Sequence, residues 1–188
     1  MKLSYELNGT GWADVKIELN DKSFDMRPSY LGEPLYDLVE AVFALSSYFN
    51  PSHRNVKTLK FSWDEEPSLC LWKLKKINDD TVYIEIKYDV DGIGDDTETV
   101  IQGECSIREF SEQLIRSMDA MIKEHGILGY LETWAGRDFP FTSYLIMKEY
   151  LLEETVERRE LSKGKKPKMA YSSLKEEFDF VFRHLKAR

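Results

Sequence analysis

Two short segments are crowded with carboxylates, side chains that can act as acids or bases, hold cations or attract basic partners. Together they hold seven acidic residues: Asp64, Glu65, Glu66, Asp89, Asp91, Asp95 and Asp96. Acid–base catalysis needs carboxylates placed in a cleft with shifted pKa values. Neighbouring acids that follow a strand are more often part of a solvated turn. The pattern therefore favours a binding surface over a catalytic one.

The second acidic segment also has the spacing with which a calcium loop begins. Asp89 and Asp91 match its first two ligand positions, but the fifth and twelfth positions are Ile93 and Val100, which have no side-chain oxygen. The glycines between these acids do not make a nucleotide loop either, because the surrounding negative charges would repel a phosphate. The sequence therefore predicts neither a metal site nor a cofactor.

The sequence offers two cysteines as candidate nucleophiles. Cys70 lies in an apolar run that reads as a strand, where a free thiol is usually buried. Cys105 directly precedes a predicted helix, whose dipole can lower a thiol pKa, but no histidine is near it in the sequence. We expect both thiols to be reduced, and we predict no catalytic residue.

The overall charge narrows the classes of partner. The 188 residues carry a formal net charge of −8 and a pI of about 5.0. Such a chain repels nucleic acids and anionic membranes, and it suits a basic protein partner. There is no apolar leader at the start and no run of about 20 apolar residues. The sequence predicts a cytoplasmic protein that binds neither nucleic acid nor membrane, and it leaves the oligomeric state open.

The elements that must position these residues follow from hydrophobic periodicity. Alternating apolar residues predict strands at about 3–7, 13–19, 59–63, 69–77, 82–88 and 98–104. Helical spacing predicts helices from Pro34 to before Asn50, from Ile107 to about Gly126, at about 142–157, and from Ser173 onward. Ser106 and Ser173 each begin a capping box, with a glutamate three residues later.

Strands that come first and helices that come later, with short turns between strands, are typical of an α+β protein. We predict an antiparallel sheet of about five to six strands, covered by three to four helices in two layers. The whole chain, residues 1–188, is expected to be one domain. A basic stretch with Gly164 and Pro167 predicts a mobile loop near residues 158–170.

The middle of the chain, about residues 56–145, carries a recurrent set of motifs. These are a Glu66-Pro67 turn, Trp72 in the next strand, and a later Gly129-Tyr130, Trp134, Phe139-Pro140 series. The set resembles an uncharacterised family of small bacterial cytoplasmic proteins for which the resemblance implies no activity. Small acidic α+β proteins of this style are also similar to the immunity proteins that accompany bacterial toxins.

The aromatic residues of these motifs have two readings. Trp63 and Trp72 flank the Glu66-Pro67 turn and are expected to pack together in the core. Alternatively, Trp72, Tyr130 and Trp134 line a pocket between helices and sheet, because aromatic residues are enriched in ligand sites. Our leading hypothesis is a non-catalytic interaction domain, of the immunity type, that binds a basic protein through the seven carboxylates. The alternatives are a small-molecule binder or enzyme with that aromatic pocket, and a subunit that dimerises through a sheet edge.

Overall fold

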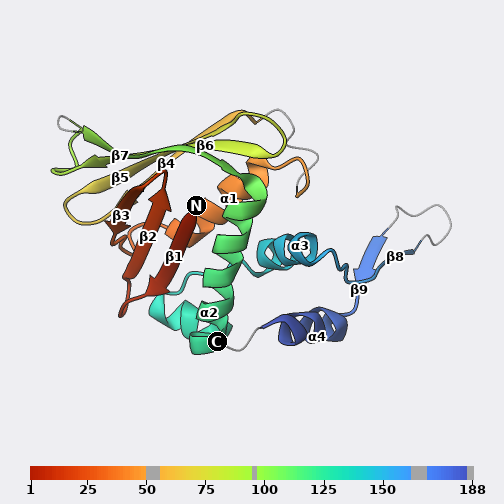
Figure 1. Cartoon of the computed structure of the whole chain (residues 1–188). Coiled ribbons are helices and arrows are strands. Elements are labelled where there is room, and N and C mark those ends of the chain that lie inside the picture. Colours follow the sequence, from red (N-terminus) through yellow and green to blue (C-terminus); the bar gives the residue numbers. More distant parts are fainter. Residues whose placement is uncertain (50–55, 95–96, 162–168, 186–188) are drawn as a thin grey trace.

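The computed structural model describes residues 1–49, 56–94, 97–161 and 169–185. The chain forms an α+β fold with antiparallel sheets and helices (Figure 1). This confirms the predicted class. The described residues form sheets of three, four and two strands. The prediction of one sheet of about five to six strands, with helices as the second layer, is therefore not matched in detail.

The N-terminal sheet consists of β1 (Lys2–Leu7), β2 (Ala13–Leu19) and β3 (Lys22–Met26). Along β2 the apolar residues are buried and the polar ones face outward, as their alternation predicts. The sequence analysis missed β3, because Phe24 and Met26 are its only apolar residues. A tight turn at Asn20 and Asp21, both with positive φ, brings β3 back along β2 and makes it a strand.

The second sheet is a meander of β4 (Thr58–Asp64), β5 (Leu69–Lys76), β6 (Thr81–Asp89) and β7 (Thr97–Ser106). Its inner face is apolar, and Trp63 packs on Trp72 with ring centroids 4.7 Å apart, as predicted. At the sheet junction the Asn20 amide lies over Gly103, where an added Cβ would be 2.1 Å from that side chain. Glycine at this position therefore lets the two sheets approach closely.

The helices α1 (Pro34–Leu45) and α2 (Ile107–Thr133) fill the space beneath the four-stranded sheet (Figure 1). Ser106 caps α2, because its hydroxyl accepts a hydrogen bond from the Glu109 amide at 2.9 Å. The predicted end of this helix at Gly126 is instead a kink with φ of 69° and ψ of 176°, beyond which the helix resumes. Glycine permits that conformation without a Cβ clash.

The C-terminal part begins with α3 (Phe141–Leu152), which ends earlier than the predicted residue 157. Next come β8 (Arg158–Leu161) and β9 (Met169–Ser172), a hairpin that projects from the body (Figure 1). The ends of the segment predicted as a basic loop are therefore strands, and residues 162–168 lie outside the described part. Helix α4 (Leu174–His184) follows, with Ser173 as its predicted cap. No helix in the described residues is long and apolar enough to cross a membrane.

Candidate functional site

The two acidic turns lie at the same end of the four-stranded sheet. The β4–β5 turn follows Asp64 and the β6–β7 turn follows Asp89, and the register pairs both of these residues with Leu69. The turns are in contact, because a Cβ on Gly92 would be 2.3 Å from the carbonyl oxygen of Pro67. We call the described residues of these turns, 64–68 and 89–94, the acidic end. Asp95 and Asp96 lie outside the described residues.

Asp89 shapes its own turn. It is 1% exposed, and its carboxylate accepts hydrogen bonds from the amides of Gly92 at 3.2 Å and Gly94 at 2.8 Å. Both glycines have positive φ, which the tight turn requires. A carboxylate used in this way holds the turn together and leaves little of itself for another molecule.

Glu65 is also engaged within the fold. Its carboxylate accepts hydrogen bonds from the Arg27 amide at 2.9 Å and from the Cys70 thiol at 3.1 Å, which ties β3 to the turn. Burial raises the pKa of the Glu65 carboxyl. Burial and the nearby Glu65 also raise the pKa of the Cys70 thiol. Cys70 and Cys105 are both buried free thiols, in agreement with the expectation that they are reduced.

Other side chains of the acidic end reach solvent to different degrees. Glu66 and Asp91 are exposed, while Asp64 is half-buried and accepts a hydrogen bond from the Glu66 amide. Beside these acids, two apolar side chains are exposed in the same turn, Val90 at 58% and Ile93 at 72%. Exposed apolar residues ringed by charge are the usual composition of a protein-binding surface. The sequence analysis considered only the acids and did not single out Val90 and Ile93.

An acidic hollow on the outer face of the three-stranded sheet continues from the acidic end. It has a volume of about 440 Å³, and Glu65 belongs to both regions. Its charged lining residues are four acids and two bases: Glu6, Asp14, Asp25, Glu65, Lys16 and Arg27. The Arg27 guanidinium lies 3.7 Å from the Asp14 carboxylate. Sequence alternation places Glu6, Asp14 and Lys16 on outward positions, but only the strand register shows that they converge with β3 and the turn.

The three aromatic pocket candidates are core residues. Trp72, Tyr130 and Trp134 are 1%, 3% and 0% exposed. Trp72 stacks on Phe61 beneath the four-stranded sheet, whereas Tyr130 packs edge-on against Phe139 at 5.4 Å near the end of α2. The indole nitrogens of Trp72 and Trp134 have no hydrogen-bond partner among the described residues.

A buried polar cluster that the sequence analysis missed joins α2 to α3. The Lys148 ammonium is 2.5 Å from the Asp119 carboxylate and 2.9 Å from the Tyr144 hydroxyl, and the lysine side chain is 3% exposed. Burial and Asp119 together raise the pKa of Tyr144, so its hydroxyl is protonated and donates to Asp119. This arrangement connects two helices and leaves no free base. The spacing of Tyr144 and Lys148, four residues apart, is the only sequence signal for it.

A second group of carboxyls lies at the start of α1. Burial, and secondarily Glu33, raises the pKa of Asp37 to about 6. Glu33 itself pairs with Arg137 at 2.9 Å. Among the described residues, no three histidine, cysteine, aspartate or glutamate side chains are placed to hold a metal ion.

Comparisons with known proteins add no further constraint. No protein-family model matches the chain, and no curated protein or solved structure shows significant similarity to it.

Proposed function

We propose that this chain is a protein-interaction domain whose acidic end binds a basic segment of a partner protein. The observation that supports this proposal is that the carboxylates of the acidic end fall into two groups, one bonded within the turns and one exposed to solvent. Asp89 and Glu65 brace the turns from within, while Glu66 and Asp91 face solvent beside Val90 and Ile93. A surface held in shape before binding loses less conformational entropy when the partner arrives.

The exposed carboxylates and the exposed apolar side chains contribute differently to binding at such a surface. The exposed carboxylates steer a basic partner and raise its association rate. The apolar pair supplies the area that a stable contact must bury. The acidic hollow beside Glu65 extends the same sign of charge over β1, β2 and β3. A cytoplasmic inhibitor of the immunity type, which neutralises a basic toxin and avoids nucleic acid, fits this description.

The test is capture of partners with three versions of the whole chain. The wild type is compared with a variant carrying Glu66→Lys, Asp91→Lys and Ile93→Asp, and with the matched control Glu132→Lys on α2. Captured proteins are quantified by mass spectrometry, starting with the products of adjacent genes. We expect a basic protein held by the wild type and the control and lost by the triple variant. A specific partner that all three chains retain equally would contradict the assignment of this surface.

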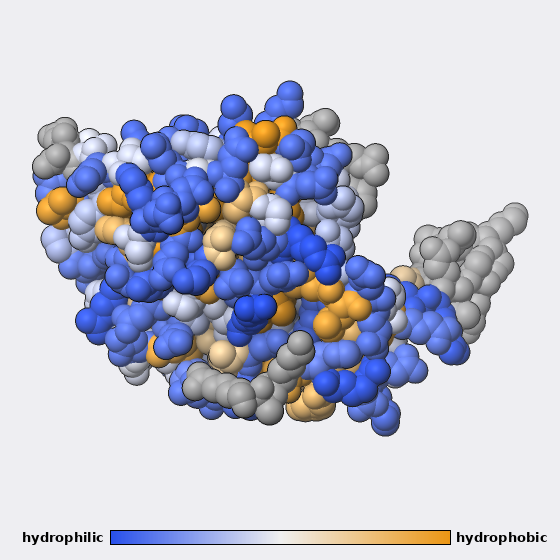
Figure 2. All heavy atoms as spheres, in the orientation of Figure 1, coloured by the Kyte–Doolittle hydropathy of each residue, from blue (hydrophilic) through white to orange (hydrophobic). Residues whose placement is uncertain are grey.

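The alternative function is binding of an apolar small molecule, and one observation favours it. A hollow of about 520 Å³ lies between the second half of α2 and α4, lined by Ile122, Phe141, Phe178 and Phe182 among others. Figure 2 shows apolar side chains gathered where α2, α3 and α4 meet. The hollow does not involve Trp72, Tyr130 or Trp134. An apolar fluorescent dye that binds the wild type and not a Phe178→Asp variant would support this alternative.

A further inference from the structure

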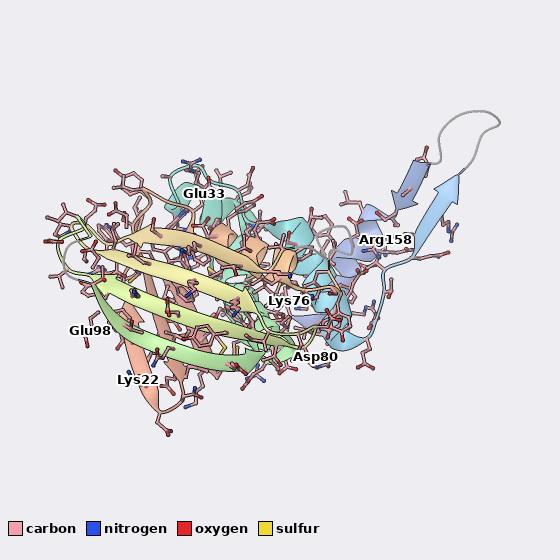
Figure 3. All side chains as sticks on the ribbon, turned by 90° about the horizontal axis from the view of Figure 1, so that it is seen from above. Lys22, Glu33, Lys76, Asp80, Glu98 and Arg158 are labelled. Carbon is pink, nitrogen blue, oxygen red and sulfur yellow. The ribbon has the colours of Figure 1, made fainter. Side chains whose placement is uncertain are left out.

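The outer face of the four-stranded sheet carries Asp64 and Asp89 of the acidic end at one edge and mainly lysines elsewhere. In Figure 3 this face points toward the viewer and the helices lie behind the sheet. Beyond those two acids, cross-strand registers assign to it four lysines and two glutamates: Lys60, Lys73, Lys75, Lys87, Glu85 and Glu104. This excess of lysines beyond the acidic end is unexpected in a chain of net charge −8. We call these residues the open face.

Three of the lysines gather around one glutamate. Lys60 is directly opposite Lys73 in the β4–β5 register, an arrangement in which like charges repel. Lys73 lies 3.2 Å from Glu85, and Lys87 lines the same shallow hollow of about 510 Å³. Its lining also includes the side chain of Leu71 and atoms of Phe61 and Trp72, whose rings pack on the other face of the sheet. Lysines that exceed their acidic neighbours beside the apolar Leu71 suit a ligand with both carboxylates and apolar side chains.

Strand β4 also offers a backbone edge beside this hollow. At its two ends the Lys76 amide bonds to the Lys57 carbonyl, and the Glu65 amide bonds to the Ser68 carbonyl, so residues 57 and 65 face β5. The antiparallel ladder between them is regular, so Thr58, Lys60 and Ser62 direct their amide and carbonyl groups away from β5. The Ser29 amide bonds to the Asp64 carbonyl, which confirms that the backbone groups of alternate residues of β4 point away from β5. No other described strand pairs with β4.

We propose that an extended acidic segment of another protein binds here by adding a strand along β4 with its carboxylates over the lysines of the open face. Strand addition satisfies the outward backbone groups, and alternate side chains of the added strand meet the hollow. A nucleic acid could pair with the charge but not with the backbone edge. A second copy of this chain is disfavoured, because antiparallel self-pairing centred on Lys60 would bring the two lysines together.

The probe is a seven-residue capped peptide in which glutamate and valine alternate. Two matched peptides separate the contributions: one with lysine in place of glutamate, and one that keeps its glutamates but is N-methylated at alternate residues. Binding to the whole chain is measured by calorimetry, and amide shifts of Thr58, Lys60 and Ser62 are followed by NMR. We expect the acidic peptide to bind, to shift these amides, and to bind at least about tenfold more tightly than either matched peptide.

Variants of the chain test the same assignment from the other side. The pair Lys60→Glu and Lys87→Glu is expected to weaken binding at least about tenfold, and Glu85→Gln to strengthen it about threefold. Lys22→Glu, on the three-stranded sheet, is the matched control and should bind like the wild type. Lys60→Gln with Lys87→Gln, checked by circular dichroism, covers the case in which the double reversal does not fold.

Four results would overturn the proposal. These are equal binding of the N-methylated peptide, equal binding of the lysine peptide, no binding of the acidic peptide, and a dimer in sedimentation with the β4 amides already protected. None of these experiments involves Glu66, Asp91 or Ile93, so the open face is tested independently of the acidic end.

Discussion

Asp119 lies within α2 and Asp91 lies in the turn between β6 and β7, and the surroundings of these two aspartates differ. Asp119 is paired with the buried Lys148 ammonium and the Tyr144 hydroxyl between two helices. Asp91 lies in a solvent-exposed turn, where its carboxylate accepts one backbone hydrogen bond, from the Ile93 amide. The comparison teaches that a carboxylate in this molecule is a candidate for binding only where the fold does not already use its charge.

Lys148→Met breaks the buried cluster and is expected to have the largest effect. Removal of the lysine leaves the Asp119 carboxylate, whose side chain is 22% exposed, without its cationic partner, so the free energy of unfolding should fall by about 3 kcal/mol. Urea unfolding of the variant and the wild type measures this change in the free energy of unfolding. The double variant Lys148→Met with Asp119→Leu should recover most of the loss. If the double variant is as unstable as the single one, the pair is not the source of the stability.

Asp89→Ala is expected to cost less, because it removes hydrogen bonds and not a charge pair. Two turn amides lose their acceptor, and the free energy of unfolding should fall by about 2 kcal/mol. Asp91→Ala is the matched control, with an expected change of about 0.5 kcal/mol or less. Chemical denaturation of both variants sharpens the distinction between bracing and exposed acids. Equal losses of unfolding free energy in the two variants would show that Asp89 and Asp91 do not differ in this way.

Asp37 is an intermediate case, half-buried and with a pKa raised to about 6 from its usual value of 3.8. The folded state binds a proton at Asp37 more tightly than the unfolded state does. Ionisation above pH 6 therefore costs stability, and lowering the pH through 6 toward 4 restores it. Asp37→Asn should stabilise the fold at pH 7.5 by about 1 kcal/mol, less than the full shift implies because the group is partly solvated.

The gain from Asp37→Asn should shrink as the pH falls from 7.5 to 4, since the native aspartic acid is then neutral as well. Thermal unfolding of both proteins across this range provides the measurement. A difference that stays constant with pH would show that ionisation of Asp37 is not responsible.

The smallest expected effect on stability belongs to Glu66→Lys together with Asp91→Lys. Both side chains are exposed, so the free energy of unfolding should change by about 0.5 kcal/mol or less. The same variant should bind a lysine-rich peptide more weakly than the wild type at low ionic strength, and salt should reduce the difference. Unchanged peptide binding, with the fold intact, would show that these two acids do not attract basic partners.

Much of the local structure could be predicted because it depends on residues that are close together in the sequence. The capping serines Ser106 and Ser173 were predicted from residues three positions apart. The packing of Trp63 on Trp72 followed from alternation on both sides of one turn. Strand β3 was missed because two apolar residues, Phe24 and Met26, are too few to establish an alternating pattern, and its pairing with β2 makes it a strand.

The candidate sites depend on long-range register, which a single sequence does not contain. Asp89 and Asp91 look alike in the sequence, and only the structure shows that Asp89 is buried under its own turn. The facing of Lys60 and Lys73 requires the β4–β5 pairing, and the Asp119–Lys148 contact requires α2 and α3 to be neighbours. The structure places the described acids, 64–66, 89 and 91, at or beside two neighbouring turns, and their role in binding is a proposal.

The placement of the four tryptophans gives the molecule a built-in fluorescent reporter. Trp63, Trp72 and Trp134 are at most 1% exposed, and their indole N–H groups have no partner among the described residues. Their emission should be blue-shifted in the native state and move to longer wavelength on denaturation. Trp12 is only half-buried, beneath the Arg27 guanidinium at 5.6 Å. An aqueous quencher should therefore reach Trp12 first, so that one label-free signal separates events near the acidic hollow from collapse of the core.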